Sequence, residues 1–216
     1  MTDPAPDCGV TDPAPDWGVT DPAPDGGWPV VAGTEGPEGT RALAGALADL
    51  ARSGDVILLV GGLGAGKTTF AQGFARRLGV VGPVTSPTFT LVRQYPCSLG
   101  QLLHADVYRL ERLAEVADLG LGELVEGGSA GDGAVALVEW GDAAAPVFGP
   151  QALTVSLAPV PAPVPAPGGA AGEAPEEMAD GIGDEARLIR IDGGGVAWAG
   201  RRRAVADALA RWTGDR

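Results

Sequence analysis

The sequence predicts an α/β fold in which helices pack against a central sheet that is mixed and mainly parallel. Two observations lead to this expectation. Short continuous apolar runs alternate with segments of helical periodicity, and a glycine-rich loop joins one run to the helix that follows. The chain has 216 residues and 45% hydrophobic content, which suit one domain with a buried core. No apolar run in the sequence approaches the ~18 residues that a membrane-spanning helix needs.

The first helix is expected at about residues 38–52, where Leu43, Leu47 and Leu50 recur at helical spacing. The apolar run VILLV at residues 56–60 comes next. A short continuous run of this kind is typical of a strand that is buried on both faces. The glycine loop follows this strand directly.

A second helix is expected after the loop, because Phe70, Phe74 and Leu78 lie at positions i, i+4 and i+8. The sequence then predicts a last helix at about residues 202–212. Further strands are expected in the apolar runs at residues 90–95, 102–105, 135–138, 153–157 and 188–191.

Two segments differ in composition from the rest. Residues 1–28 contain the repeats TDPAPDCGV, TDPAPDWGV and TDPAPDGGW with six Asp and no Lys or Arg, and we interpret them as a disordered acidic tail. Residues 159–185 alternate Ala, Pro, Val and Gly and carry six acids, which indicates a flexible insertion in a domain at 29–216. Without these 12 acids, 16 acids face 15 bases, so the net charge of the predicted folded part is −1 rather than −13. The near-neutral core argues against strong direct binding to RNA.

The loop GGLGAGKT at residues 61–68 matches the pattern G-x-x-x-x-G-K-[ST], which cradles the phosphates of a nucleoside triphosphate. Its glycines let successive N–H groups turn toward phosphate oxygens, and the helix that follows adds the positive end of its dipole. Lys67 can reach the β- and γ-phosphates, and the Thr68 hydroxyl can ligate Mg²⁺. Strand, loop and helix in this order predict a P-loop NTPase-like three-layer sandwich. The loop residues expected to contact the nucleotide are Gly62, Leu63, Gly64, Ala65, Gly66, Lys67, Thr68 and Thr69.

A chance glycine-rich turn is the alternative, since the chain has 35 glycines. Lys67 is, however, the only lysine beside fourteen arginines. The broad planar fork of Arg would fit poorly among phosphates, so a retained lysine favours phosphate binding. The lack of a second lysine also excludes the Asn-Lys-x-Asp motif of Ras-type GTPases, which makes adenine or weak base selectivity the expectation.

Two acids close apolar runs and are expected at the carboxyl edge of the sheet, beside the loop. Asp106 follows residues 102–105, and Glu139 follows residues 134–138. Either acid could hold the Mg²⁺ shell or simply begin a solvated loop. His104 is expected to have a structural hydrogen-bonding role rather than a catalytic one.

The segment Ser86-Pro87-Thr88 lies where nucleotide-sensing loops often occur. Its two hydroxyls beside a proline could sense the γ-phosphate and act as a switch, or they could only form a turn. The residues alone leave both alternatives open.

Four segments together resemble one family. They are GGLGAGKTTF at 61–70, SPTFTL at 86–91, HADVYRL at 104–110 and VEWGD at 138–142. In this order and spacing they are similar to the TsaE (YjeE) family, the small bacterial ATPases of tRNA threonylcarbamoyladenosine synthesis. The resemblance covers roughly residues 30–158 and resumes near Arg187.

The resemblance implies a slow accessory ATPase that is cytoplasmic and not membrane-bound, with ATP and Mg²⁺ as its cofactors. Its expected partners are TsaD-like and TsaB-like proteins, and it would act on tRNA only through that complex, supporting threonylcarbamoyl transfer to adenosine 37. The two cysteines, Cys8 and Cys97, suit a reducing cytoplasm because they are too few for a disulfide framework.

The resemblance also implies roles by position. Lys67 would hold phosphates, Thr68 and Glu139 would ligate Mg²⁺, and Asp106 would orient the attacking water, with a place in the metal shell as the other option. Trp140 would lie beside the nucleotide.

The adenine is expected near Glu38 and Thr40, and the segment from Ser86 to Thr88 would be the switch. Two positions depart from the family pattern. Gly62 stands where the family usually has an acid, and Asp142 stands where it often has Glu or Gln, so Asp142 receives no role.

Two other classes of function compete with this hypothesis. A small-molecule kinase would share the glycine loop but should carry an arginine-rich lid, which is not evident in the sequence. A nucleic-acid-binding module could use Arg201–Arg203 together with Trp198 and Trp212 to touch RNA in a complex.

Overall fold

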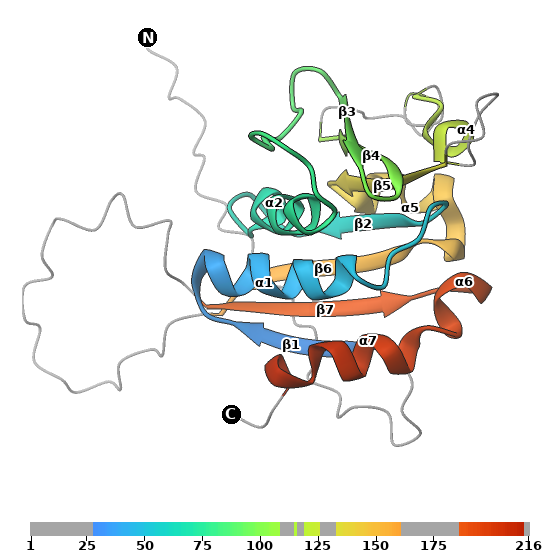
Figure 1. Cartoon of the computed structure of the whole chain (residues 1–216). Helices are drawn as coiled ribbons and strands as arrows, with labels where there is room; N and C mark the ends of the chain where they lie inside the picture. The colour runs from blue at the N-terminus through green and yellow to red at the C-terminus, as the bar shows by residue number, and fades with distance from the viewer. Residues whose placement is uncertain (1–27, 109–114, 116–118, 126–132, 161–185, 214–216) are drawn as a thin grey trace, which may run out of the picture.

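The computed structural model describes residues 28–108, 115, 119–125, 133–160 and 186–213 (Figure 1). The predicted acidic tail and Pro/Ala insertion lie outside the described residues, except for Trp28, Pro159 and Val160. The strands are β1 (Val30–Thr34), β2 (Val56–Val60), β3 (Val92–Cys97), β4 (Gly100–Asp106), β5 (Ala134–Glu139), β6 (Leu153–Pro159) and β7 (Arg187–Gly193). The helices are α1 (Gly36–Ala48), α2 (Lys67–Arg77), α4 (Leu121–Val125), α5 (Gly141–Phe148), α6 (Gly195–Ala199) and α7 (Arg202–Leu209), with the short 3-10 helices η2 (Gly149–Gln151) and η3 (Ala210–Trp212).

The described strands form one seven-stranded sheet in the order β1-β7-β6-β2-β5-β4-β3. The neighbours β6, β2, β5 and β4 are parallel, whereas β7 is antiparallel to both β1 and β6, and β3 is antiparallel to β4. Only β3 and β7 therefore run against the common direction. The prediction of a mixed, mainly parallel sheet is confirmed.

Strand β2 separates two apolar layers because its side chains alternate between the faces of the sheet. Ile57 and Leu59 join a large cluster with the apolar sides of α1, α2 and α7, while Leu58 joins a smaller cluster with α4 and α5. All three side chains are almost completely buried. The continuous apolar run is thus explained by helices on both faces, and the architecture is the predicted three-layer sandwich (Figure 1).

Several boundaries differ from the sequence prediction. Helix α1 ends at Ala48 rather than near residue 52, because the N–H groups of Leu50 and Ala51 bond to carbonyls three residues back instead of four. Pro159 belongs to β6, where it pairs with Arg187, so the predicted insertion begins one residue too early. The elements β1, α4, α5 and α6 were not predicted at all.

The proposed RNA contact of Arg201 and Trp198 is wrong, because both residues are buried. Arg201 donates to both carboxylate oxygens of Asp55 at 2.6 Å and to the carbonyl of Leu50 at 3.0 Å. Its guanidinium also lies 3.8 Å from the ring centre of Trp198. Arg201 therefore connects the C-terminal helices to the start of β2, and its side chain is only 9% exposed.

Helices α1 and α2 approach closely at Gly73, since a Cβ at this position would overlap the backbone of Arg41. Gly45 lies on the facing helix, but there an added Cβ would meet the Arg77 side chain at an ordinary 3.7 Å. The two glycines therefore form a matched pair for testing the contact.

Gly73→Ala should lower the free energy of unfolding by about 1–3 kcal/mol, because overpacking outweighs the helix preference of Ala. Gly45→Ala should be neutral or stabilising by up to about 1 kcal/mol, since Ala is the better helix former and the space is available. Urea unfolding followed by circular dichroism measures both changes. Equal effects of the two substitutions would contradict the close approach at Gly73.

Candidate functional site

The glycine loop between β2 and α2 lies at the carboxyl edge of the parallel strands. At Gly61 a Cβ would overlap the carbonyl of Leu157 on β6, so the first loop position requires glycine. Gly66 has φ +103° and directly precedes α2, with no side chain capping the first turn. The first N–H groups of α2 are therefore not satisfied by a side-chain cap, which makes the helix start suitable for an anion.

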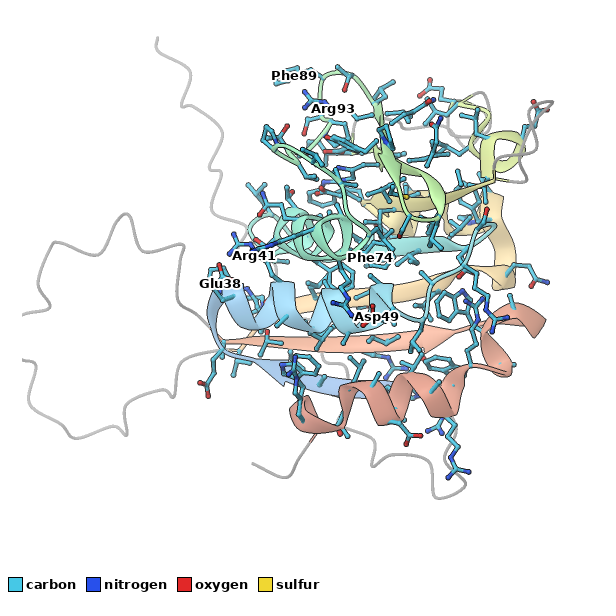
Figure 2. The ribbon with its side chains drawn as sticks, viewed as in Figure 1. Glu38, Arg41, Asp49, Phe74, Phe89 and Arg93 are labelled. Carbon is cyan, nitrogen blue, oxygen red and sulfur yellow. The ribbon has the colours of Figure 1, made fainter. Side chains whose placement is uncertain are left out.

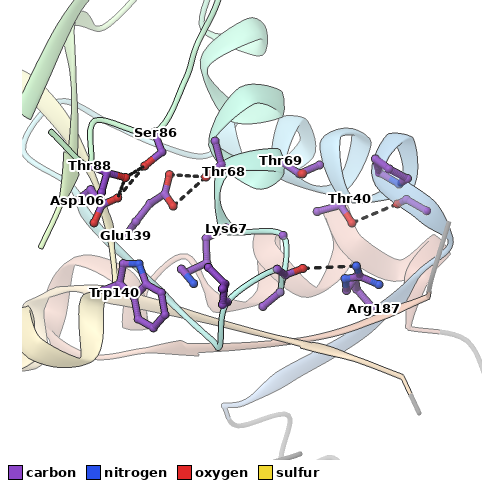
Figure 3. Close-up of a pocket in the computed structure, with 16 residues that line it drawn as sticks. Thr40, Lys67, Thr68, Thr69, Ser86, Thr88, Asp106, Glu139, Trp140 and Arg187 are labelled. Atoms are coloured by element: carbon purple, nitrogen blue, oxygen red, sulfur yellow. Dashed lines mark hydrogen bonds between the residues drawn. The ribbon is translucent and has the colours of Figure 1, made fainter. Parts of the chain in front are cut away.

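A cavity of about 350 Å³ opens beside this loop (Figure 3). The predicted site residues that line it are Thr40, Leu63, Gly64, Ala65, Gly66, Lys67, Thr68, Thr69, Ser86, Thr88, Asp106, Glu139 and Trp140. Residues from five separate parts of the chain thus meet in one place, at the edge where the parallel strands end.

Lys67 is only 5% exposed, and its ammonium group donates to the carbonyls of Gly61 and Gly62 at 2.7 and 2.8 Å. It also lies 3.6 Å from the ring centre of Trp140. Burial lowers the pKa of Lys67 below its ordinary value, and the carboxylates of Glu139, Asp106 and Asp142 oppose this change. An anion placed in the cavity would favour the charged form of Lys67 further.

Glu139 links the glycine loop to the neighbouring strands. The Thr68 hydroxyl donates to its carboxylate, at 2.9 Å from each oxygen, and Nε2 of His104 lies 2.9 Å from Oε1. Because a carboxylate only accepts, Nε2 carries the proton that makes this bond. Nδ1 of His104 has no hydrogen-bond partner among the described residues, and the ring is fully buried. His104 therefore forms the kind of structural hydrogen bond that was predicted, and its partner is Glu139.

Asp106 gathers the two hydroxyls of the predicted switch. Its Oδ2 accepts from Ser86 at 2.6 Å and from Thr88 at 2.8 Å, while its Oδ1 accepts the backbone N–H of Tyr108 at 3.1 Å (Figure 3). Pro87 lies between the two hydroxyl residues but does not line the cavity. The segment from residue 86 to 88 is thus connected to the cavity through a carboxylate rather than being an isolated turn.

Trp140 adopts the left-handed conformation, with φ +59°, which is strained for a residue with a side chain. Its ring packs against Tyr108, with 4.6 Å between the ring centres, and lies below the Lys67 ammonium. The next residue, Gly141, is needed because a Cβ there would overlap Leu58 of β2. This turn places an aromatic face at the wall of the cavity.

Thr68 and Glu139 could hold a small cation, since hydroxyl and carboxylate oxygens are ligands that Mg²⁺ prefers. Among the described residues no group of three or more His, Cys, Asp or Glu is arranged to hold a metal ion. A cation at Thr68 and Glu139 would therefore need further oxygen ligands from a bound phosphate and from water, which is the usual situation for Mg²⁺.

Two predicted nucleotide contacts do not line the cavity. Glu38 is 83% exposed in its side chain and pairs with Arg41 at 2.6 Å. Gly62 contributes a carbonyl to Lys67, and an added Cβ there would meet nothing within 4 Å. No packing contact therefore requires glycine at the position where the family pattern usually has an acid.

Three lining residues were missed by the sequence reasoning, namely Gly36, Pro37 and Arg187. Arg187 is 7% exposed, and its Nη2 lies 3.5 Å from the carbonyl of Gly64. It adds a second positive charge to the cavity wall, opposite the strand that carries Glu139. Arg187 lies 123 residues from Gly64 in the sequence, and the antiparallel pairing of β7 with β6 brings it to the loop. No local sequence motif could therefore have indicated its place in the site.

The fold and the site define the class of this chain, an α/β protein with a glycine loop at the carboxyl edge of a mixed sheet. A family model described as "Threonylcarbamoyl adenosine biosynthesis protein TsaE" matches residues 34–161. The chain belongs to the TsaE family.

Curated relatives named "tRNA threonylcarbamoyladenosine biosynthesis protein TsaE" agree with this membership. The relative from Bacillus subtilis is 49% identical over 107 residues, which are 50% of this chain and 63% of the relative. The relative from Streptomyces coelicolor is 46% identical over 106 residues, 47% of this chain and 67% of the relative. The match thus spans less than two thirds of the B. subtilis relative.

A solved structure shares the architecture. The crystal structure of Bacillus subtilis YdiB matches with a TM-score of 0.59 and 30% sequence identity, and the match covers 85% of this chain and 95% of that one. No helix among the described residues is long and apolar enough to cross a membrane.

We predict that His104 stabilises the fold through Glu139. His104→Leu should lower the free energy of unfolding by about 1–3 kcal/mol, because it leaves a buried carboxylate with one donor fewer. His104→Gln, whose amide can still donate, should retain most of the stability. Urea unfolding without nucleotide measures both, and equal losses for Leu and Gln would show that the bond to Glu139 does not matter.

Proposed function

We propose that this chain is an ATP-binding, slowly hydrolysing accessory ATPase of tRNA threonylcarbamoyladenosine synthesis. It would be cytoplasmic, would act with TsaD-like and TsaB-like partners, and would reach tRNA only through their complex. The observation that carries the proposal is the meeting of the lone lysine, the Thr68–Glu139 pair and the Ser86–Thr88–Asp106 cluster around one glycine loop. Membership of the TsaE family supports the pathway.

The residues of the cavity fit a nucleoside triphosphate with Mg²⁺. In the proposed mechanism Lys67 leaves the carbonyls of Gly61 and Gly62 and places its ammonium against the β- and γ-phosphates. Thr68 and Glu139 hold Mg²⁺, which would neutralise charge on the phosphates when bound. The aromatic face of Trp140 would then border the nucleotide.

Asp106 would orient the attacking water, as the position of the residue in the family pattern implies. Its Oδ2 is engaged by the hydroxyls of Ser86 and Thr88. A water molecule could use Oδ2 only after those hydroxyls move, whereas Oδ1 accepts from the Tyr108 N–H and keeps one acceptor position. Use of Oδ2 would therefore make hydrolysis depend on the switch segment. This dependence offers a physical reason for slow turnover and for control by a partner.

Arg187 would bind the part of the nucleotide that lies over Gly64, since its guanidinium reaches the carbonyl of that residue. Thr40, Gly36 and Pro37 line the same side of the cavity and would border the base. Thr40 shares a hydrogen bond of 3.0 Å with the Thr34 hydroxyl, so its side chain is oriented by β1.

Lys67→Ala should abolish ATP hydrolysis and weaken ATP binding at least about tenfold, because removing a charge-assisted contact costs roughly 1.5–3 kcal/mol. Calorimetry with Mg-ATP and a phosphate-release assay measure the two effects. Arg190→Gln is the matched control, since Arg190 pairs with Asp192 and does not line the cavity. ATP hydrolysis at the wild-type rate by the Lys67→Ala protein would refute the proposed site.

Depletion of this protein from its native cells should lower the threonylcarbamoyladenosine content of digested tRNA, measured by mass spectrometry. The wild-type chain and Arg190→Gln should restore the modified nucleoside, and Lys67→Ala should not. A pull-down from the same cells with ATP present should recover TsaD-like and TsaB-like proteins. Unchanged tRNA together with recovery of a metabolic enzyme would instead favour a small-molecule kinase.

A further inference from the structure

A second cavity of about 520 Å³ lies between α1 and α2, and no residue that lines it also lines the cavity at the glycine loop. Its charged lining residues are Glu38 and Arg41 of α1, Asp49 directly after α1, Arg76 and Arg77 of α2, and Arg211 of η3. We call it the arginine groove. Figure 2 labels Glu38 and Arg41 near the start of α1 and Asp49 just beyond its end.

The arginine groove carries an excess of positive charge. Its two acids are already paired, Glu38 with Arg41 and Asp49 with Arg77, each at 2.6 Å. Arg76 is exposed and has no ion pair or hydrogen bond within the described part of the chain. Arg211 is also exposed, and its guanidinium stacks 3.8 Å from the ring centre of Trp212. The groove therefore offers two guanidinium groups to an incoming carboxylate.

The same chain contains a segment of opposite charge. Residues 1–27 carry six Asp and neither Lys nor Arg. They join the described fold at Trp28, whose side chain packs against the apolar cluster under α1, α2 and α7. Trp28, the first described residue after the acidic segment, therefore lies on the side of the sheet that carries the arginine groove. At ~3.3 Å per extended residue, 27 residues can span several times the width of a small domain.

We propose that residues 1–27 of this chain bind in the arginine groove, with Asp carboxylates on Arg76 and Arg211. Each exposed ion pair contributes little on its own, because water and salt screen the two charges. Covalent attachment compensates for this weakness, because a short tether gives an effective concentration in the millimolar range. The nonapeptide repeat adds to the effect, since a shift by one unit presents an equivalent pair of Asp residues to the groove.

Occupation by the acidic segment would keep the groove from other polyanions. The Asp carboxylates of the segment carry the negative charge that phosphates carry in RNA. Every chain that has the groove also has the segment. This inference is independent of the proposed ATPase function, because the residues that line the groove do not line the cavity at the glycine loop.

The two cysteines make a direct test possible with the full-length chain. In a Cys97→Ser background a nitroxide on Cys8 should selectively weaken the amide NMR signals of Gly45 and Gly73, which line the groove. Chemical reduction of the nitroxide gives the reference spectrum. The weakening should disappear at about 0.5 M NaCl, where screening reduces the Debye length to about 4 Å.

Arg76→Gln combined with Arg211→Gln should abolish the effect on Gly45 and Gly73. The control pair, Arg190→Gln with Arg203→Gln, removes the same charge outside the groove and should leave the effect unchanged. Loss of the effect with both pairs would show a response to net charge alone and would overturn the proposal.

Three other results would also overturn it. They are no weakening at Gly45 and Gly73, weakening centred on the glycine loop instead, and weakening that appears only when a labelled chain is mixed with a second, isotope-enriched chain. The last result would assign the groove to the tail of another copy rather than to its own.

Discussion

The Glu139 carboxylate accepts hydrogen bonds from residues that lie 71 and 35 positions away in the chain, Thr68 at the start of α2 and His104 in β4. These contacts require the three neighbouring strands β2, β5 and β4 to end at the same level of the sheet. Parallel pairing of β2, β5 and β4 provides this, since Asp106 of β4 pairs directly with Glu139 of β5. The positions of the glycine loop, of Asp106 and of the Ser86–Thr88 segment relative to Glu139 all depend on that register.

The same arrangement explains why polar residues are tolerated in a buried position. His104, Asp106, Glu139 and Lys67 are each at most 5% exposed, yet every one of them has a partner within 2.6–2.9 Å. An unpaired buried charge would cost several kcal/mol, so the network must stay complete. Substituting one member would leave its buried neighbour without a hydrogen-bond partner. The His104 and Lys67 variants should therefore affect stability or binding more than surface variants do.

Sequence reasoning recovered the parts of the molecule that are encoded locally. The glycine loop, the buried strand before it and the acids that end β4 and β5 follow from residue type and short-range pattern, and the structure brings them together. Helix α5 was missed because its start depends on the left-handed Trp140 and on Gly141 lying against Leu58, a contact across the chain.

Arg187 and the Asp55–Arg201 pair were missed for the same reason. Arg201 reaches Asp55 across 146 residues, and nothing beside either residue indicates its partner. Pairing of this kind depends on the order of the strands, which the local pattern does not contain. The acidic composition of the two low-complexity segments, in contrast, is visible in the sequence. The arginine groove is not, because its residues come together only when α1 packs beside α2.

The connection between β6 and β7 has a consequence for how the chain can change. The backbone N–H of Val160 donates to the carbonyl of Ala186 at 2.9 Å, and Pro159 pairs with Arg187, so the two ends of the connection are held together by the sheet. With the ends fixed, doubling the length between them costs only about 0.6 kcal/mol. This position can therefore gain or lose residues, or accept a whole inserted domain, while strand order stays the same. Because Arg187 begins β7 at this point and lines the cavity, such a change would occur next to the candidate site while the residues of the site stay in place.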